Sequence, residues 1–185
     1  MSEAAWLVLS LALSLGGFLM LGRRTSPPGL TSAQSMLLLG GVGMLAGFWF
    51  DAREGNLATL ASVCLGGKRG IAAMLALHWN QMPAMHLGMV AGSLATVPLL
   101  SRSGAGWLSQ SRAGLAQNLA CSAWMFLGMA AATTAFVELG SQAGGAPGAA
   151  AMVGAMGAGM AWGMVAGVSL HRAWAGLRSH VGAAA

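Results

Sequence analysis

Long stretches without a charged side chain constrain this sequence more than any other feature. The two longest cover residues 70–101 and 139–171, and charged residues make up only 7% of the chain. A soluble domain carries about 25% charged residues. About 20 consecutive apolar residues cross a bilayer as a helix, because a helix satisfies its own backbone hydrogen bonds in lipid. The sequence therefore predicts an all-α, polytopic membrane helix bundle.

Five stretches are long enough to cross the bilayer, and together they predict a single integral membrane domain over residues 1–185. The predicted spans cover residues 4–21, 34–50, 71–100, 115–139 and 149–170. The third is the longest and contains Pro83, which predicts a kink there. Residues 56–66 are apolar over only about half a span. We leave open whether they form a re-entrant segment, and a crossing there would change the topology.

Basic residues predict the orientation of these spans. With the N-terminus outside, six arginines face the cytoplasm and three basic residues face out, as the positive-inside rule expects. The six are Arg23, Arg24, Arg102, Arg112, Arg172 and Arg178, against Arg53, Lys68 and Arg69. We therefore predict a bacterial-type inner (plasma) membrane protein with a cytoplasmic C-terminus. The basic residues occur singly or in pairs, so the net charge of +5 does not indicate a nucleic-acid surface.

Motifs of familiar enzymes are missing from the sequence. It contains no phosphate-binding loop with its lysine, no HExxH and no GxSxG. Proton-driven transporters usually carry acidic residues deep in their spans. Here Glu138 is the one acid close to membrane depth, at the end of the fourth span. We predict that the protein is not an enzyme.

Sulfur and imidazole side chains remain, and they recur at helical spacing. The chain has fourteen methionines. In the third span Met74, His78, Met82, Met85 and Met89 lie within an arc of about 80°. Steps of four residues link Cys121, Met125 and Met129 in the fourth span, and Met152, Met156, Met160 and Met164 in the fifth. Counted from the outer ends, Met82, Met125 and Met160 are expected at one depth.

Thioether and thiolate ligands, with imidazole, select Cu(I) among biological metals. A stack of weak sites of this kind can pass an ion from one to the next. The spacing predicts copper as the bound metal and a set of soft ligands within the bundle. They are His78, Met82, Met85, Met89, Cys121, Met125, Met129, Met156 and Met160.

Packing offers a second interpretation of the same stripes. Methionine fills irregular gaps between helices, and fourfold spacing occurs on any packed helix face. Gly159, Gly163 and Gly167 form a ridge of small residues beside the methionines. Such a ridge predicts close helix contact, either within the chain or with a membrane-protein partner or a second copy.

Polar residues in the third span are harder to explain by packing. His78, Asn80, Gln81 and His86 all fall within it, and polar residues in a span usually face the bundle or a cavity. His86 lies about 40° outside the methionine arc, so we expect it to form a hydrogen bond with a neighbouring helix instead. Asn118, at the start of the fourth span, is expected at the membrane interface.

Three classes of function follow from these observations. The first is a membrane protein that binds or conducts a soft metal ion such as Cu(I). The second is a non-catalytic structural or assembly subunit of a larger membrane complex. The third is a redox subunit that binds haem or a quinone, with His78 and either Met129 or Met156 as axial ligands. The third is disfavoured because no second histidine lies deep in another span.

Overall fold

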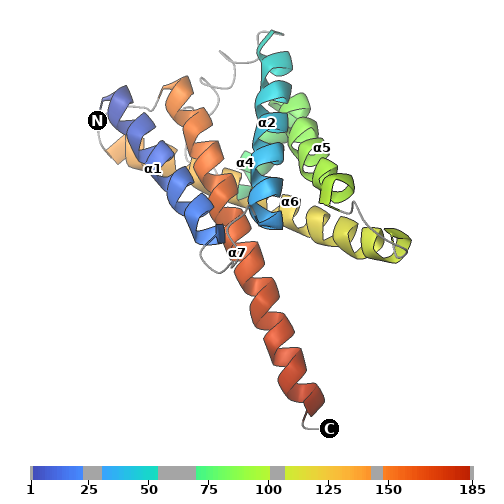
Figure 1. Ribbon diagram of the computed structural model, residues 1–185. Coiled ribbons are helices and arrows are strands. Elements are labelled where there is room, and N and C mark those ends of the chain that lie inside the picture. The colour runs from blue at the N-terminus through green and yellow to red at the C-terminus, as the bar shows by residue number, and fades with distance from the viewer. Residues whose placement is uncertain (1, 23–30, 54–69, 101–106, 143–147, 184–185) are drawn as a thin grey trace.

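The computed structural model describes residues 2–22, 31–53, 70–100, 107–142 and 148–183, and all regular structure within them is α-helical. The helices gather into one bundle, and the C-terminal end of α7 projects beyond the others (Figure 1). They are α1 (Glu3–Gly22), α2 (Ser32–Arg53), α4 (Ile71–Gln81), α5 (Pro83–Leu100), α6 (Trp107–Gln142) and α7 (Ala149–Ala183). The predicted all-α bundle is confirmed. Residues 56–66 lie outside the described residues.

Several of these helices suit a bilayer. The stretches Glu3–Gly22, Ser32–Arg53, Leu115–Gln142 and Ala150–Trp174 are each long and apolar enough to cross a membrane. Pro83–Val97 is a shorter apolar helix. Large apolar side chains such as Leu11, Val42 and Leu127 stand exposed on the bundle surface. Extended apolar surfaces of this kind are covered by lipid or protein rather than water, and together with the four long apolar helices they indicate a membrane protein.

The third predicted span is divided into two helices. α4 ends at Gln81, and Met82 leaves the helical region with φ −137° and ψ 58°, while its N–H still donates to the His78 carbonyl at 2.9 Å. α5 then begins at Pro83. The first position of a helix suits proline, because the N–H that proline lacks would have no helical partner there.

Two different caps begin α2 and α5. At α2 the Gln34 N–H donates to Thr31 Oγ1 at 3.0 Å, and the Thr31 N–H donates to Gln34 Oε1 at 2.9 Å. This reciprocal pair is a capping box, which a sequence can specify locally. At α5 the cap comes from another helix, because buried Asp51 of α2 accepts from the N–H groups of Ala84 at 3.2 Å and Met85 at 2.7 Å.

A glycine-lined interface, the α2–α5 seam, joins these two helices in antiparallel orientation. Gly43 lies against Gly88, and Gly47 lies against Ala84 and Met85. A Cβ atom added to Gly47 would stand 2.7 Å from the Met85 Cα. The two backbones are therefore too close for any side chain between them.

A second glycine-lined interface, the α6–α7 seam, joins the two longest helices, also antiparallel. Gly159 and Gly163 lie against Gly128, and a Cβ added to Gly167 would stand 2.6 Å from Trp124 Cδ1. The ridge predicted from the sequence thus packs inside the chain. On its other side α7 holds α1 in parallel orientation, with Trp162 Nε1 donating to the Leu13 carbonyl at 3.0 Å.

Candidate functional site

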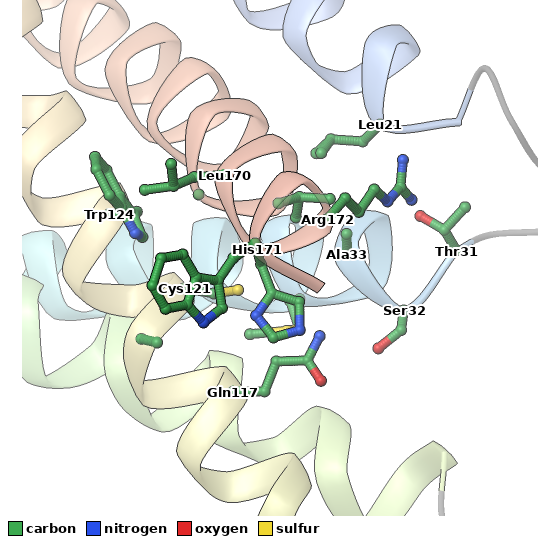
Figure 2. A pocket seen from close by; sticks show the side chains of 15 residues that line it. Leu21, Thr31, Ser32, Ala33, Gln117, Cys121, Trp124, Leu170, His171 and Arg172 are labelled. Atoms are coloured by element: carbon green, nitrogen blue, oxygen red, sulfur yellow. The ribbon is translucent and has the colours of Figure 1, made fainter. Parts of the chain in front are cut away.

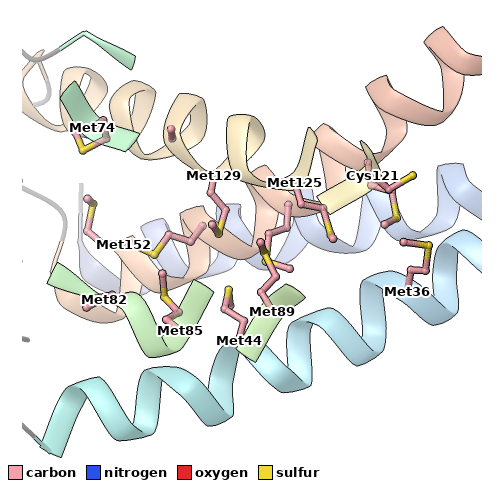
Figure 3. Packing of buried hydrophobic residues seen from close by; sticks show 14 of the residues in the cluster. Met36, Met44, Met74, Met82, Met85, Met89, Cys121, Met125, Met129 and Met152 are labelled. Atoms are coloured by element: carbon pink, nitrogen blue, oxygen red, sulfur yellow. The ribbon is translucent and has the colours of Figure 1, made fainter. Parts of the chain in front are cut away.

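A cluster of buried sulfur atoms, here called the sulfur row, occupies the space between the helices. It holds twelve of the fourteen methionines together with Cys121. Figure 3 shows it extending along the bundle, from Met74 and Met82 at one end to Cys121 and Met36 at the other. The methionines are Met36, Met44, Met74, Met82, Met85, Met89, Met125, Met129, Met152, Met156, Met160 and Met164.

Methionine and leucine differ in burial within the bundle. Among the described side chains, Leu21 is the one fully buried leucine, and every valine and isoleucine is at least partly exposed. Leucine and methionine have similar volume and usually substitute for one another in cores at little cost. Similar volume therefore does not by itself explain why methionine is fully buried where leucine and valine are mostly only partly buried.

The structure gathers the residues predicted as metal ligands into one buried region. All eight sulfur-bearing members belong to the sulfur row, and His78 is 1% exposed beside it. The predicted depth of Met125 relative to the methionines of the third span differs from the structure, however. A Cβ added at Gly40 would lie 3.5 Å from the Met89 carbonyl and 3.8 Å from Met125 Cε, so Met125 reaches the level of Met89 rather than Met82.

Two histidines face each other at the break between α4 and α5. His78 and His86 are both buried, and their ring centroids are 6.1 Å apart. His86 Nδ1 lies 2.6 Å from the Met82 carbonyl, and its ring stacks on Phe126 at 4.3 Å. The Nε2 atoms of both rings are buried without a hydrogen-bond partner among the described residues. The bond expected from His86 to a neighbouring helix is thus absent from the described contacts.

The other polar residues of this segment turn outward. Asn80 is exposed and Gln81 is half-buried. Of the four polar side chains between His78 and His86, only the two histidines are buried. The same segment brings buried Asp51 close, since its carboxylate binds the N–H of Met85, the residue before His86. No spacing in the sequence indicated this role for Asp51.

Asn118 is buried between two helices. Its Nδ2 donates to the Ser93 carbonyl at 3.2 Å and to Thr96 Oγ1 at 3.0 Å. These contacts tie α6 to α5. That Asn118 lies at the depth of the membrane interface stays a prediction.

The sulfur row opens into a cavity of about 630 Å³ near the end of α1, between α2, α6 and α7 (Figure 2). Cys121 and Met36 belong to the row and also line the cavity. Its polar lining includes Gln117, His171 and Arg172. Figure 2 shows the Cys121 and His171 side chains extending into the same region.

The described residues hold no group of three or more histidine, cysteine, aspartate or glutamate side chains placed to bind one metal ion. Comparison with protein-family models, with curated proteins and with solved structures finds no match to this chain.

Proposed function

We propose that this protein binds a soft monovalent metal ion, Cu(I), in the sulfur row and passes it along the bundle. The sorting of methionine to the interior carries the proposal. If the interior required only apolar volume, leucine would share it, since leucine is more common than methionine in the sequence and packs as well. A thioether differs from leucine by being a ligand for Cu(I).

The shape of the row supports conduction rather than storage. Conduction requires several weak sites in sequence, because one tight site would trap the ion. On α2, Asp51 lies beside row member Met85 and Met36 lies at the other end of the row. The two are fifteen residues apart, which is about 22 Å along a helix. The path begins at the histidine pair beside Asp51 and ends at the cavity lined by Cys121.

We further propose five membrane spans, with α4 and α5 together forming the third span, kinked near Pro83. The antiparallel seams α2–α5 and α6–α7 and the parallel contact of α1 with α7 agree with alternating spans. The N-terminus then lies outside, and the C-terminus lies in the cytoplasm of a bacterial-type cell. Reporter fusions after Arg24, Glu54, Arg112, Gly145 and the C-terminus are expected to read in, out, in, out, in. A cytoplasmic signal at Glu54 would overturn this arrangement.

Copper content at matched expression tests the metal proposal. Met82→Leu and Met156→Leu keep the buried volume and remove the sulfur, so each should lower bound copper per protein. Met20→Leu is the matched control, since Met20 is exposed and lies outside the row, and it should match the parent. A parent that takes up neither Cu(I) nor Ag(I) in reductant would refute the proposal. The chain would then be a structural or assembly subunit packed with methionine.

A further inference from the structure

The break between α4 and α5 contains two buried ring nitrogens without a hydrogen-bond partner among the described residues. A buried polar atom without a hydrogen bond is costly and needs an explanation when it occurs in a native fold. Here two occur together, on His78 and His86, and both rings are at most 1% exposed. Two adjacent unpaired acceptors or donors suggest a ligand shared between them.

The backbone fixes which nitrogen of His86 is available. A carbonyl oxygen only accepts, so His86 Nδ1 must carry the hydrogen that it donates to Met82 at 2.6 Å. In the neutral ring Nε2 then presents a bare lone pair. Metal-binding histidines are oriented in the same way, by donating their other N–H to a carbonyl or carboxylate.

The distance between the two rings suits one ion. A metal lies about 2 Å from an imidazole nitrogen and hence roughly 3 Å from the ring centroid. One ion shared by two rings separates the centroids by roughly 5 Å at a tetrahedral angle, and by about 6 Å when the nitrogens lie on nearly opposite sides. The observed 6.1 Å fits the wider angle.

Charge also favours a cation at this position. The Asp51 carboxylate is 3% exposed, and both hydrogen bonds that it makes with described residues come from backbone N–H groups of α5. A helix N-terminus offsets about half of one negative charge. A monovalent cation one residue further along α5 would offset the remainder.

We infer that His78 and His86 together hold one Cu(I) ion at this break, with the Met82 carbonyl positioning His86. The inference rests on the proposed function, because this site would be the first position at which an ion binds on its path along the sulfur row. Met82 and Met85 are buried in the same segment and offer thioethers as a further ligand. The sequence prediction included His78 alone, and His86 is the new member.

His86→Phe separates ligation from packing. Phenylalanine keeps a ring against Phe126 and removes both nitrogens, so the variant should fold as the parent does. We expect the full-length purified variant to bind Cu(I) at least tenfold more weakly in competition with a chromophoric chelator. Imidazole scattering in the copper X-ray absorption spectrum should also decrease. His78→Phe should have the same effects, and His171→Ala, at the exposed histidine of the cavity, should have none at this site.

The outcomes distinguish this inference from the proposed function. If the parent binds Cu(I) or Ag(I) but shows no imidazole ligand, and His86→Phe keeps its affinity, the histidine site is refuted while the sulfur row stands. If the parent binds neither ion, both fail. Under a purely structural role His86→Phe would leave metal binding unchanged.

Discussion

The two glycine seams and the sulfur row solve the same problem, helix contact in an apolar medium, in opposite ways. In the α2–α5 and α6–α7 seams the backbones touch, and no side chain fits between them. Between these pairs the helices stand apart, and flexible methionines fill the space. In lipid, where apolar side chains gain little by leaving the solvent, close backbone packing supplies much of the association energy. The seams therefore hold the fold, and the row between them is free to serve another purpose.

Substitution in the seams should have the largest effect on stability. Gly43→Leu places a side chain against Gly88 and Gly92, and Gly163→Leu places one against Trp124 and Gly128. Each helix pair must separate, so each variant should lose about 3 kcal/mol or more of unfolding free energy. The melting temperature and the monodisperse fraction in detergent measure this loss.

Gly41→Leu is the matched control for that comparison. Gly41 lies on the same helix as Gly43, but nothing stands within 4 Å of a Cβ added there. It should melt within a few degrees of the parent. Equal damage from Gly41→Leu and Gly43→Leu would mean that α2 tolerates leucine poorly everywhere, and the seam would not be the cause.

Asp51 links a seam to the row, and its removal should have the next largest effect. Asp51→Ala leaves the N–H groups of Ala84 and Met85 without their acceptor, at a cost of about 2 kcal/mol. Asp51→Asn keeps one acceptor oxygen and should cost less. Thermal unfolding of both variants checks the order, and an Asp51→Ala protein as stable as the parent would show that the cap contributes nothing.

The polar contact between α6 and α5 should matter less. Asn118→Leu removes two hydrogen bonds to α5, and such bonds in membrane proteins contribute about 1 kcal/mol or less. Gln117→Leu, one residue earlier and exposed toward the cavity, serves as its control and should change little. If Gln117→Leu lowered stability more than Asn118→Leu, the Asn118 hydrogen bonds would not be the contact that stabilises this part of the bundle.

Leucine in the row should have the smallest effect on stability. Met156→Leu and Met160→Leu conserve volume, so each should cost less than about 1.5 kcal/mol. The comparison predicts that stability and copper content respond to different residues, glycine for the first and methionine for the second. A Met160→Leu variant that unfolds like Gly163→Leu would place the row among the elements that hold the fold together.

Much of the architecture could be predicted because its signals are local. Freedom from charge over a span's length identifies membrane helices wherever they pack. A four-residue step places Met152, Met156, Met160 and Met164 on one face, and all four are buried. The Thr31–Gln34 capping box and the start of α5 at Pro83 depend on residues a few positions apart. The four-residue spacing alone likewise predicts the ridge of Gly159, Gly163 and Gly167.

The α2–α5 seam and two methionines of the sulfur row were missed because the four-residue spacing rule was not applied to α2 and α5. Gly43 and Gly47 on α2, and Gly88 and Gly92 on α5, repeat at the spacing of four that was used only for α7. Met36 and Met44 are eight residues apart on the buried face of α2 and belong to the sulfur row. Both signals were present in the sequence.

What the sequence by itself determined is therefore a set of apolar helices and the residues that share a face on each. The tertiary structure decided which faces meet: Asp51 against the start of α5, His86 beside His78 across the break at Met82, and methionine rather than leucine in the buried centre. The reason is that lipid is as apolar as the bundle interior, so hydrophobicity does not tell an inward face from an outward one. Only contact between residues far apart in the chain makes that choice.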